Sequence, residues 1–352
     1  MMNRFETVAR TPSQTSLCAM GAAVVFACAL SVAQFASVSP AFAQSTSSKP
    51  EKSSSKKETD KKESGKKDAS KADAPAAAPS AAAVAATTPP SNEPVQVGQL
   101  SSIPAPAIAA RAWMTMDVTS GQIVASSNAD MKIEPASLTK IMTAYVAFNV
   151  INEKRLTMDQ QINVSQAAWK TKGSRMFIEP RKPVNVDELL KGVIIQSGND
   201  ASVALAEAVS GNETSFATVM NEEAKRMGMT NTNFMNATGL PDPQHVTTVR
   251  DLAMLARRMI LDHPDYFYYY STKEFTYNKI KQSNRNRLLW ADPSVDGMKT
   301  GHTDAAGYCL VATAKRGDRR VITILMGSDS SATRAEESLK LLNWTFQNFE
   351  TI

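Results

Sequence analysis

The sequence predicts an α+β domain built on one antiparallel five-stranded sheet, flanked by helices and joined to a helical subdomain. Three observations support this prediction. Short apolar segments bounded by turns occur at both ends of the region after residue 107, helical patterns lie between them, and short turns join the last three strands. Apolar residues make up 43% of the 352 and charged residues 21%, which excludes a wholly disordered chain.

The N-terminus has the pattern of an export signal. Arg4 and Arg10 precede a run of apolar and small residues at 17–38, and an A-x-A site at 41–43 predicts cleavage before Gln44. We therefore expect residues 1–43 to be a signal peptide. An uncleaved membrane anchor is the alternative, because the run is long enough to span a bilayer.

Residues 44–107 are of low complexity, rich first in Ser, Lys and Glu and then in Ala and Pro. Such a segment buries too little apolar surface to offset its ordering entropy, so a disordered linker is predicted. A simple spacer is the favoured role, and a tether across the cell envelope is the alternative. We therefore expect residues 108–352 to form one domain that is long enough to bury a large core.

The domain begins with two strands around a turn and continues through helices. Strands are predicted at 113–117 and 122–125. Helices follow at 137–152, 186–196, 201–209, 214–227 and, capped by Thr247 or Thr248, up to 261. The last part comprises strands at 295–300, 306–315 and 320–327 and a helix at 331–349, which should pack on the sheet through Leu339, Leu342, Trp344 and Phe346.

Charge and cysteine content exclude several functions. The net charge is +5, yet residues 94–352 contain 28 basic and 26 acidic residues, so no basic face for nucleic acid is expected. Cys309 is the one cysteine after the N-terminal segment, which excludes a disulfide framework and a Cys-rich zinc site and predicts a core residue. The three histidines have no metal-ligand spacing, and no metal or cofactor is predicted.

The first candidate site is the pair Ser137 and Lys140, at the start of a predicted helix. Residues three apart share a helix face, so the hydroxyl and the amine can meet. We expect Ser137 at the N-cap, where the helix N-terminus favours developing negative charge. A lysine whose pKa is lowered by burial and cationic neighbours can act as a base. A capping serine with a solvated lysine is the alternative interpretation.

Two further segments contain polar groups suited to catalysis. Ser197 and Asn199 lie on a loop between two predicted helices, where an ordinary helix C-terminus is the alternative. Lys299 and Thr300 end a predicted strand just before Gly301. There a lysine and a hydroxyl can hold a carboxylate, and the glycine lets a ligand approach the backbone.

The order S-x-x-K, S-G-N, K-T-G is typical of penicillin-binding proteins and class A β-lactamases. From residue 113 to the end, the chain resembles the low-molecular-mass penicillin-binding proteins, serine-type D-alanyl-D-alanine carboxypeptidases of peptidase family S11. The stretches that carry the resemblance are 135–143, 196–201, 236–240, 284–286 and 295–303. It implies a β-lactamase/transpeptidase-like fold.

The resemblance also implies a mechanism. Ser137 attacks the carbonyl between the two D-alanines that end a peptidoglycan stem peptide, and Lys140 takes its proton. Ser197 relays a proton to the leaving D-alanine along a path polarised by Lys299. Asn199 binds the substrate amide and positions the base.

Substrate binding and inhibition follow from the same resemblance. The backbone N–H groups of Ser137 and His302 form the oxyanion hole. Lys299, Thr300, Gly301 and His302 bind substrate, and Arg285 with Thr300 holds the terminal carboxylate. β-Lactams acylate the same serine.

Family members of this kind usually continue into a β-rich domain and an amphipathic membrane helix, whereas this sequence stops at Ile352. A naturally short form and a truncated reading frame are both open. We expect a location in the periplasm or cell envelope, with inner-membrane association through an uncleaved N-terminus as an open alternative.

Three other functions compete with the carboxypeptidase. A D,D-endopeptidase would cut peptidoglycan cross-links with the same residues. A class A β-lactamase is disfavoured because no E-x-x-L-N glutamate occurs between Met227 and Leu240. A non-catalytic wall-binding or β-lactam-sensing module would use the fold without the chemistry.

Overall fold

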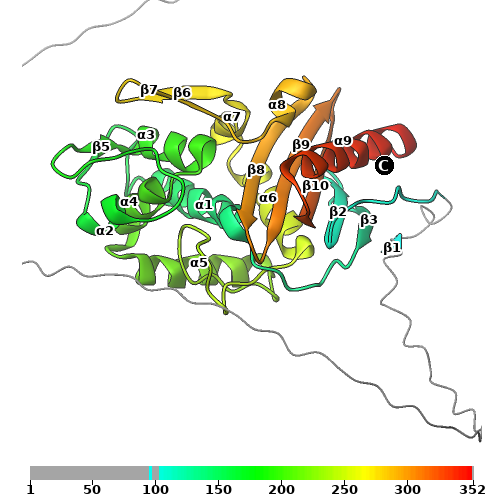
Figure 1. Cartoon of the computed structure of the whole chain (residues 1–352), viewed down its shortest axis with the longest axis horizontal. Helices are drawn as coiled ribbons and strands as arrows, with labels where there is room; N and C mark the ends of the chain where they lie inside the picture. Colours follow the sequence, from blue (N-terminus) through cyan, green and yellow to red (C-terminus); the bar gives the residue numbers. More distant parts are fainter. Residues whose placement is uncertain (1–94, 97–102, 351–352) are drawn as a thin grey trace, which may run out of the picture. The chain divides into compact units, whose positions relative to one another are not determined.

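The computed structural model describes residues 95–96 and 103–350 (Figure 1). The predicted signal peptide 1–43 and most of the predicted linker 44–107 lie outside the described residues. Two described segments fall within the linker range. Val95–Gln96 forms strand β1, and the carbonyl of Ala107 accepts a hydrogen bond from the Lys340 amine. Packing on the domain thus begins before residue 108.

The predicted five-stranded antiparallel sheet is confirmed. Its order is β3-β2-β10-β9-β8, and the two-residue β1 extends the β3 edge. The strands are β2 (Ala112–Asp117), β3 (Ile123–Ser127), β8 (Val295–Thr303), β9 (Gly307–Arg316) and β10 (Arg319–Ser328). β8 is therefore an edge strand, a position that becomes important for the site.

Helices cover both faces of this sheet (Figure 1). Alternate residues of β10 show the division: Val321 and Leu325 pack toward α9 (Ser331–Asn348), whereas Ile322 and Ile324 belong to the larger core on the other face. Helix α9 packs on the sheet as predicted, through the fully buried Leu342. The face of α9 that packs on the sheet also includes the buried Leu341, which the sequence pattern did not identify.

The larger core is formed with the helical part of the chain. The helices are α1 (Thr139–Asn152), α2 (Gln166–Lys170), α3 (Val186–Lys191), α4 (Asn199–Ser210), α5 (Glu213–Met227), α6 (Val249–Asp262), α7 (Tyr268–Ser271) and α8 (Leu288–Ala291). Thr248 caps α6, as predicted, by accepting a hydrogen bond from the Asp251 N–H. Cys309 is fully buried in this core, as expected.

Several short elements complete the domain. Turn η2 (Ala136–Leu138) precedes α1, the π-helical turn η3 (Gly192–Gln196) extends α3, and η4 (Pro264–Tyr266) precedes α7. Two small hairpin-like sheets pair β4 (Gln161–Ile162) with β5 (Val184–Asn185) and β6 (Glu274–Tyr277) with β7 (Ile280–Ser283). Within residues 95–96 and 103–350, no helix combines the length and apolar character that crossing a membrane requires.

Candidate active site

The start of helix α1 places Ser137 against Lys140. Ser137 lies in turn η2, and Lys140 belongs to the first turn of α1. The Lys140 Nζ lies 3.1 Å from Ser137 Oγ, so the two groups meet as the spacing predicts. The expected N-cap role of Ser137 is wrong, because Leu138 occupies that position and no side chain caps the helix. The serine hydroxyl is therefore not committed to a helix cap.

Lys140 is buried, with 1% of its surface exposed. Its amine also donates to Asn199 Oδ1 at 2.7 Å and to the carbonyl of Thr238. Burial, and then the positive charge of Arg285, lower the pKa of Lys140 to about 7. A large fraction of this amine is then neutral near pH 7, as a general base requires.

A second serine–lysine pair faces the same space. The Lys299 amine donates to Ser197 Oγ at 2.9 Å and to the carbonyl of Thr300 at 3.0 Å. Ser197 ends η3 in a left-handed conformation, with φ of 65°, which turns its side chain out of the helical path. Burial, and then the charge of Lys140, lower the pKa of Lys299 well below its ordinary value.

Gly301 lets the edge strand β8 lie close to turn η2. A Cβ at Gly301 would lie 3.2 Å from the carbonyl oxygen of Pro135 and 3.3 Å from Ala136 Cβ. A larger residue would therefore push β8 away from η2. Because β8 is an edge strand, its outer backbone groups have no strand partner on this side. Gly301 and His302 thus line the same cavity as Ser137.

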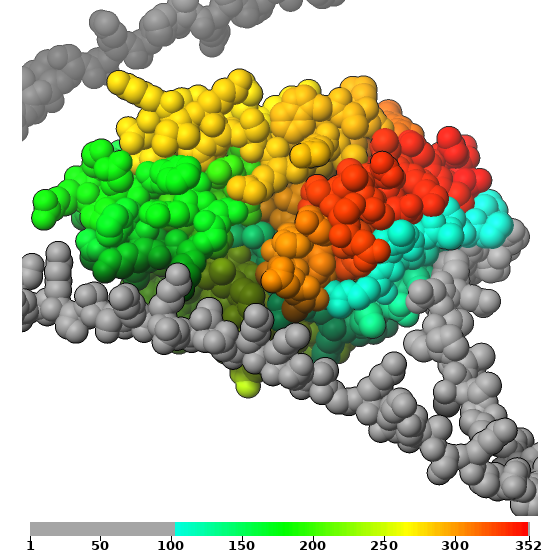
Figure 2. Space-filling model, viewed as in Figure 1, coloured from blue at the N-terminus to red at the C-terminus, as the bar shows by residue number. Residues whose placement is uncertain are grey.

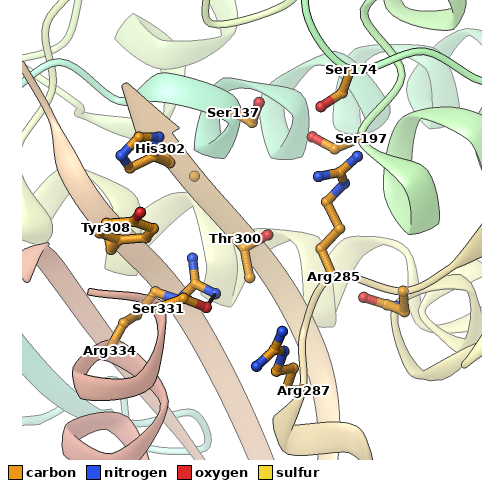
Figure 3. Close-up of a pocket in the computed structure, with 12 residues that line it drawn as sticks. Ser137, Ser174, Ser197, Arg285, Arg287, Thr300, His302, Tyr308, Ser331 and Arg334 are labelled. Atoms are coloured by element: carbon orange, nitrogen blue, oxygen red, sulfur yellow. Dashed lines mark hydrogen bonds between the residues drawn. The ribbon is translucent and has the colours of Figure 1, made fainter. Parts of the chain in front are cut away.

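This cavity has a volume of about 480 Å³ and is shown in Figure 3. The predicted site residues in its lining are Ser137, Ser197, Arg285, Thr300, Gly301 and His302. Lys140, Asn199 and Lys299 are buried beside it, with their polar atoms directed at the two serines or at each other. The structure therefore brings together all the residues that the sequence selected.

The cavity also contains Asn284, from the stretch 284–286 that carries the family resemblance, and residues that the sequence did not indicate, namely Ser174, Arg287, Tyr308, Ser331 and Arg334. Arg334 comes from α9, far along the chain and outside any motif. Arg287 follows Arg285 after one residue, and the Asn-Arg-Asn-Arg alternation at 284–287 was a signal that could have identified it.

The cavity is cationic. Arg285 is held by its Nε, which donates to the carbonyl of Gln196 at 2.8 Å. Arg334 is 7% exposed and donates to Ser331 Oγ at 3.1 Å. Burial lowers the pKa of both arginines. No Asp or Glu is among the lining residues, so an anionic group such as a carboxylate fits this cavity.

A buried contact supports the backbone next to Ser137. Thr139 Oγ1 donates to the carbonyl of Ala136 at 2.8 Å and lies 3.0 Å from His245 Nε2. Because the threonine proton is used by Ala136, we assign the shared proton of the second contact to His245. Burial lowers the pKa of His245 to about 4, so the imidazole is neutral near pH 7. Ala136 itself adopts a φ of 48°.

The fold and these serine–lysine pairs define the class of serine enzymes to which penicillin-binding proteins and class A β-lactamases belong. The chain belongs to the peptidase S11 family, D-alanyl-D-alanine carboxypeptidase, whose model matches residues 99–330. The predicted family is thereby confirmed.

Curated relatives carry the same name. The chain is 47% identical over 258 residues to D-alanyl-D-alanine carboxypeptidase DacC of Escherichia coli (strain K12), covering 71% of this chain and 64% of that protein. It is 43% identical over 266 residues to DacA of Haemophilus influenzae, covering 74% and 67%. The chain thus spans 64% of the DacC length.

Solved structures confirm the predicted penicillin-binding-protein fold. Penicillin binding protein 5 from Haemophilus influenzae matches with a TM-score of 0.68 and 42% identity, over 70% of this chain and 73% of that chain. Penicillin-binding protein D2 from Listeria monocytogenes, in its ampicillin-bound form, matches with a TM-score of 0.64 and 31% identity, over 69% and 100%.

Proposed function

We propose that this chain is a serine D-alanyl-D-alanine carboxypeptidase that removes the terminal D-alanine from peptidoglycan stem peptides through an acyl-enzyme. The observation that carries the proposal is the buried Lys140 amine within 3.1 Å of the Ser137 hydroxyl. Family membership and the names of the relatives support the same reaction. The cationic cavity beside the serine suits a substrate that ends in a free carboxylate.

Acylation begins when Ser137 Oγ attacks the carbonyl carbon of the penultimate D-alanine. Neutral Lys140 accepts the hydroxyl proton as the C–O bond forms, and its contact with Asn199 fixes the direction of the amine. The negative charge that develops on the carbonyl oxygen is stabilised by backbone N–H groups of Ser137 and His302.

Departure of the leaving group, which completes acylation, uses the pair Ser197 and Lys299. As the C–N bond breaks, the proton that Lys140 took from Ser137 passes to the leaving nitrogen through the Ser197 hydroxyl, which the Lys299 amine orients and polarises. The terminal carboxylate of the leaving D-alanine binds Thr300 and Arg285. Water then attacks the acyl carbon and gives a proton to Lys140, which returns it to Ser137 Oγ as the ester bond breaks.

β-Lactams would stop the reaction at the acyl-enzyme. The ampicillin-bound relative supports this part of the proposal. We further propose that residues 1–43 are a signal peptide that directs export and is removed before Gln44, so that the domain acts on the cell wall from the periplasm. An uncleaved N-terminus that tethers the chain to the inner membrane is the alternative.

The proposed function is tested by D-alanine release from diacetyl-L-Lys-D-Ala-D-Ala. The wild type should release D-alanine, Ser137→Ala should release none above background, and Ser215→Ala, at an exposed helical serine, should match the wild type. A peptide ending in L-alanine should resist cleavage. Undiminished release by Ser137→Ala would refute the proposal.

The rate of acylation by a β-lactam should rise as the pH rises through about 7. Lys140 accepts a proton only when neutral, and its lowered pKa means that the neutral fraction grows above this pH. The second-order acylation rate constant, measured from about pH 5 to pH 9, tests this. A rate that stays flat over that range would argue against Lys140 as the base.

Replacing Arg285 by alanine should raise KM about tenfold while changing kcat less than about threefold. The guanidinium binds the free carboxylate both in the ground state and in the transition state, so its loss weakens binding throughout the reaction. Steady-state kinetics with the D-Ala-D-Ala peptide at about pH 9 measures both constants, because the Lys140 amine is then largely neutral and the effect of the Arg285 charge on its pKa matters little. A fall in kcat at constant KM would instead assign Arg285 to the chemical step.

A further inference from the structure

Three guanidinium groups line the cavity, and a single terminal carboxylate does not account for all of them. Arg285, Arg287 and Arg334 all contribute to the lining, which contains no acidic side chain. Arg334 enters from α9, and Arg287 comes from the loop before α8 (Figure 3). Their charges interact, because burial and then the nearby Arg287 charge lower the pKa of Arg334.

The backbone around Arg287 is rigidly anchored. Asn286 is 1% exposed, and its Nδ2 donates to the carbonyl of Gly297 at 2.9 Å, while its Oδ1 accepts from the Leu288 N–H at 3.2 Å. Asn284 is also buried and donates to the carbonyl of Thr272. Because the buried asparagines alternate with the arginines, both arginines are directed outward into the cavity.

Arg287 lies farther from Ser137 than the carboxylate position at Thr300. Its neighbour Asn286 is bound to Gly297, at the start of β8, whereas Gly301 of the same strand lies against the turn that holds Ser137. Four residues of a strand span roughly 13 Å. In Figure 3, Thr300 lies between Ser137 and Arg287. Among the described residues, no acidic side chain forms an ion pair with Arg287.

We propose that Arg287, together with Arg334 from α9, forms a second anion subsite that binds an additional carboxylate carried by the leaving group. The inference rests on the proposed function, since it extends the site beyond the leaving D-alanine. Two kinds of substrate could supply this group, and both would present one carboxylate in addition to the α-carboxylate of the terminal residue. The additional carboxylate can come from the side chain of an acidic D-residue in the leaving position or from the stem of a cross-linked peptide whose cross-link is cut.

The test compares matched leaving groups. Diacetyl-L-Lys-D-Ala peptides ending in D-Ala, D-Glu and the isosteric neutral D-Gln are assayed for kcat/KM, together with a cross-linked muropeptide dimer. The proteins are the wild type, Arg287→Ala, the charge reversal Arg287→Glu, and Arg155→Ala, which removes an exposed arginine paired with Glu153 outside the cavity.

The wild type should prefer D-Glu over D-Gln by about fivefold, the effect of one solvent-accessible charged hydrogen bond. Arg287→Ala should abolish this preference and leave D-Ala release within about twofold of the wild type. Arg287→Glu should favour D-Gln over D-Glu, and Arg155→Ala should behave as the wild type. A loss confined to the dimer would place the second carboxylate on the cross-linked stem.

Two results would overturn the inference. One is equal activity of the wild type toward D-Glu, D-Gln and D-Ala peptides and no selective loss for the dimer in Arg287→Ala. The other is a uniform loss on every substrate, which would place Arg287 at the common carboxylate or in the fold. Failure of the proposed function is distinct, because the wild type would then release no D-alanine at all.

Discussion

Lys140→Arg is expected to lower kcat/KM for the D-Ala-D-Ala peptide by at least about a thousandfold. Arginine keeps a positive charge at this position but is never neutral near pH 7, so it cannot take the Ser137 proton. The wild-type amine can do so because burial and the Arg285 charge lower the pKa of Lys140 to about 7. The loss should be nearly as large as for Ser137→Ala.

Two measurements accompany this variant. Lys132→Arg, an exposed lysine shortly before turn η2, makes the same exchange outside the site and should match the wild type. Circular dichroism and the thermal midpoint show whether Lys140→Arg still folds, because the larger guanidinium must fit a fully buried position. A folded variant with more than about a tenth of the parent activity would show that Lys140 is not the base.

Gly239→Ala should disrupt the active site without touching a reacting group. An added Cβ would lie 1.8 Å from the carbonyl oxygen of Ala136 and 2.3 Å from its carbonyl carbon, next to Ser137. Gly239 also has a φ of 80°, which alanine adopts only with strain. We expect a loss of about 3 kcal/mol or more in the free energy of unfolding, together with slow acylation by penicillin.

Gly211→Ala is the matched control for this effect. Gly211 has a φ of 78°, but nothing lies within 4 Å of its added Cβ. It should lose only about 1 kcal/mol, the cost of the left-handed conformation. Chemical denaturation measures both variants. Equal losses would show that backbone conformation alone matters and that the contact between Gly239 and Ala136 is unimportant.

The proposed catalytic segments were predictable because each is local. Ser137 and Lys140 share one helical turn, and Lys299 and Thr300 are adjacent, so the order of short motifs was enough to select them. Arg334 was not predictable in this way. Its helix was expected to pack on the sheet, but the apolar pattern does not specify that the first turn of α9 lies beside the cavity, where Arg334 joins the lining.

The hydrophobic periodicity of the sequence located most helix and strand boundaries, but it did not predict the backbone conformation at turns and helix ends. The helix predicted to end near residue 196 closes with the π-helical turn η3, which positions Ser197 in a left-handed conformation. The hairpin β6–β7 was missed because its turn is Asn278-Lys279, with positive φ at both residues and no glycine to mark it. Tertiary packing imposes both features.

The most direct test of the central claim is mass spectrometry of the protein after incubation with benzylpenicillin. The account predicts one penicilloyl group per chain, located by peptide mapping on Ser137 and absent from Ser137→Ala. An adduct on another residue, or one that persists in Ser137→Ala, would contradict the assignment of Ser137 as the nucleophile.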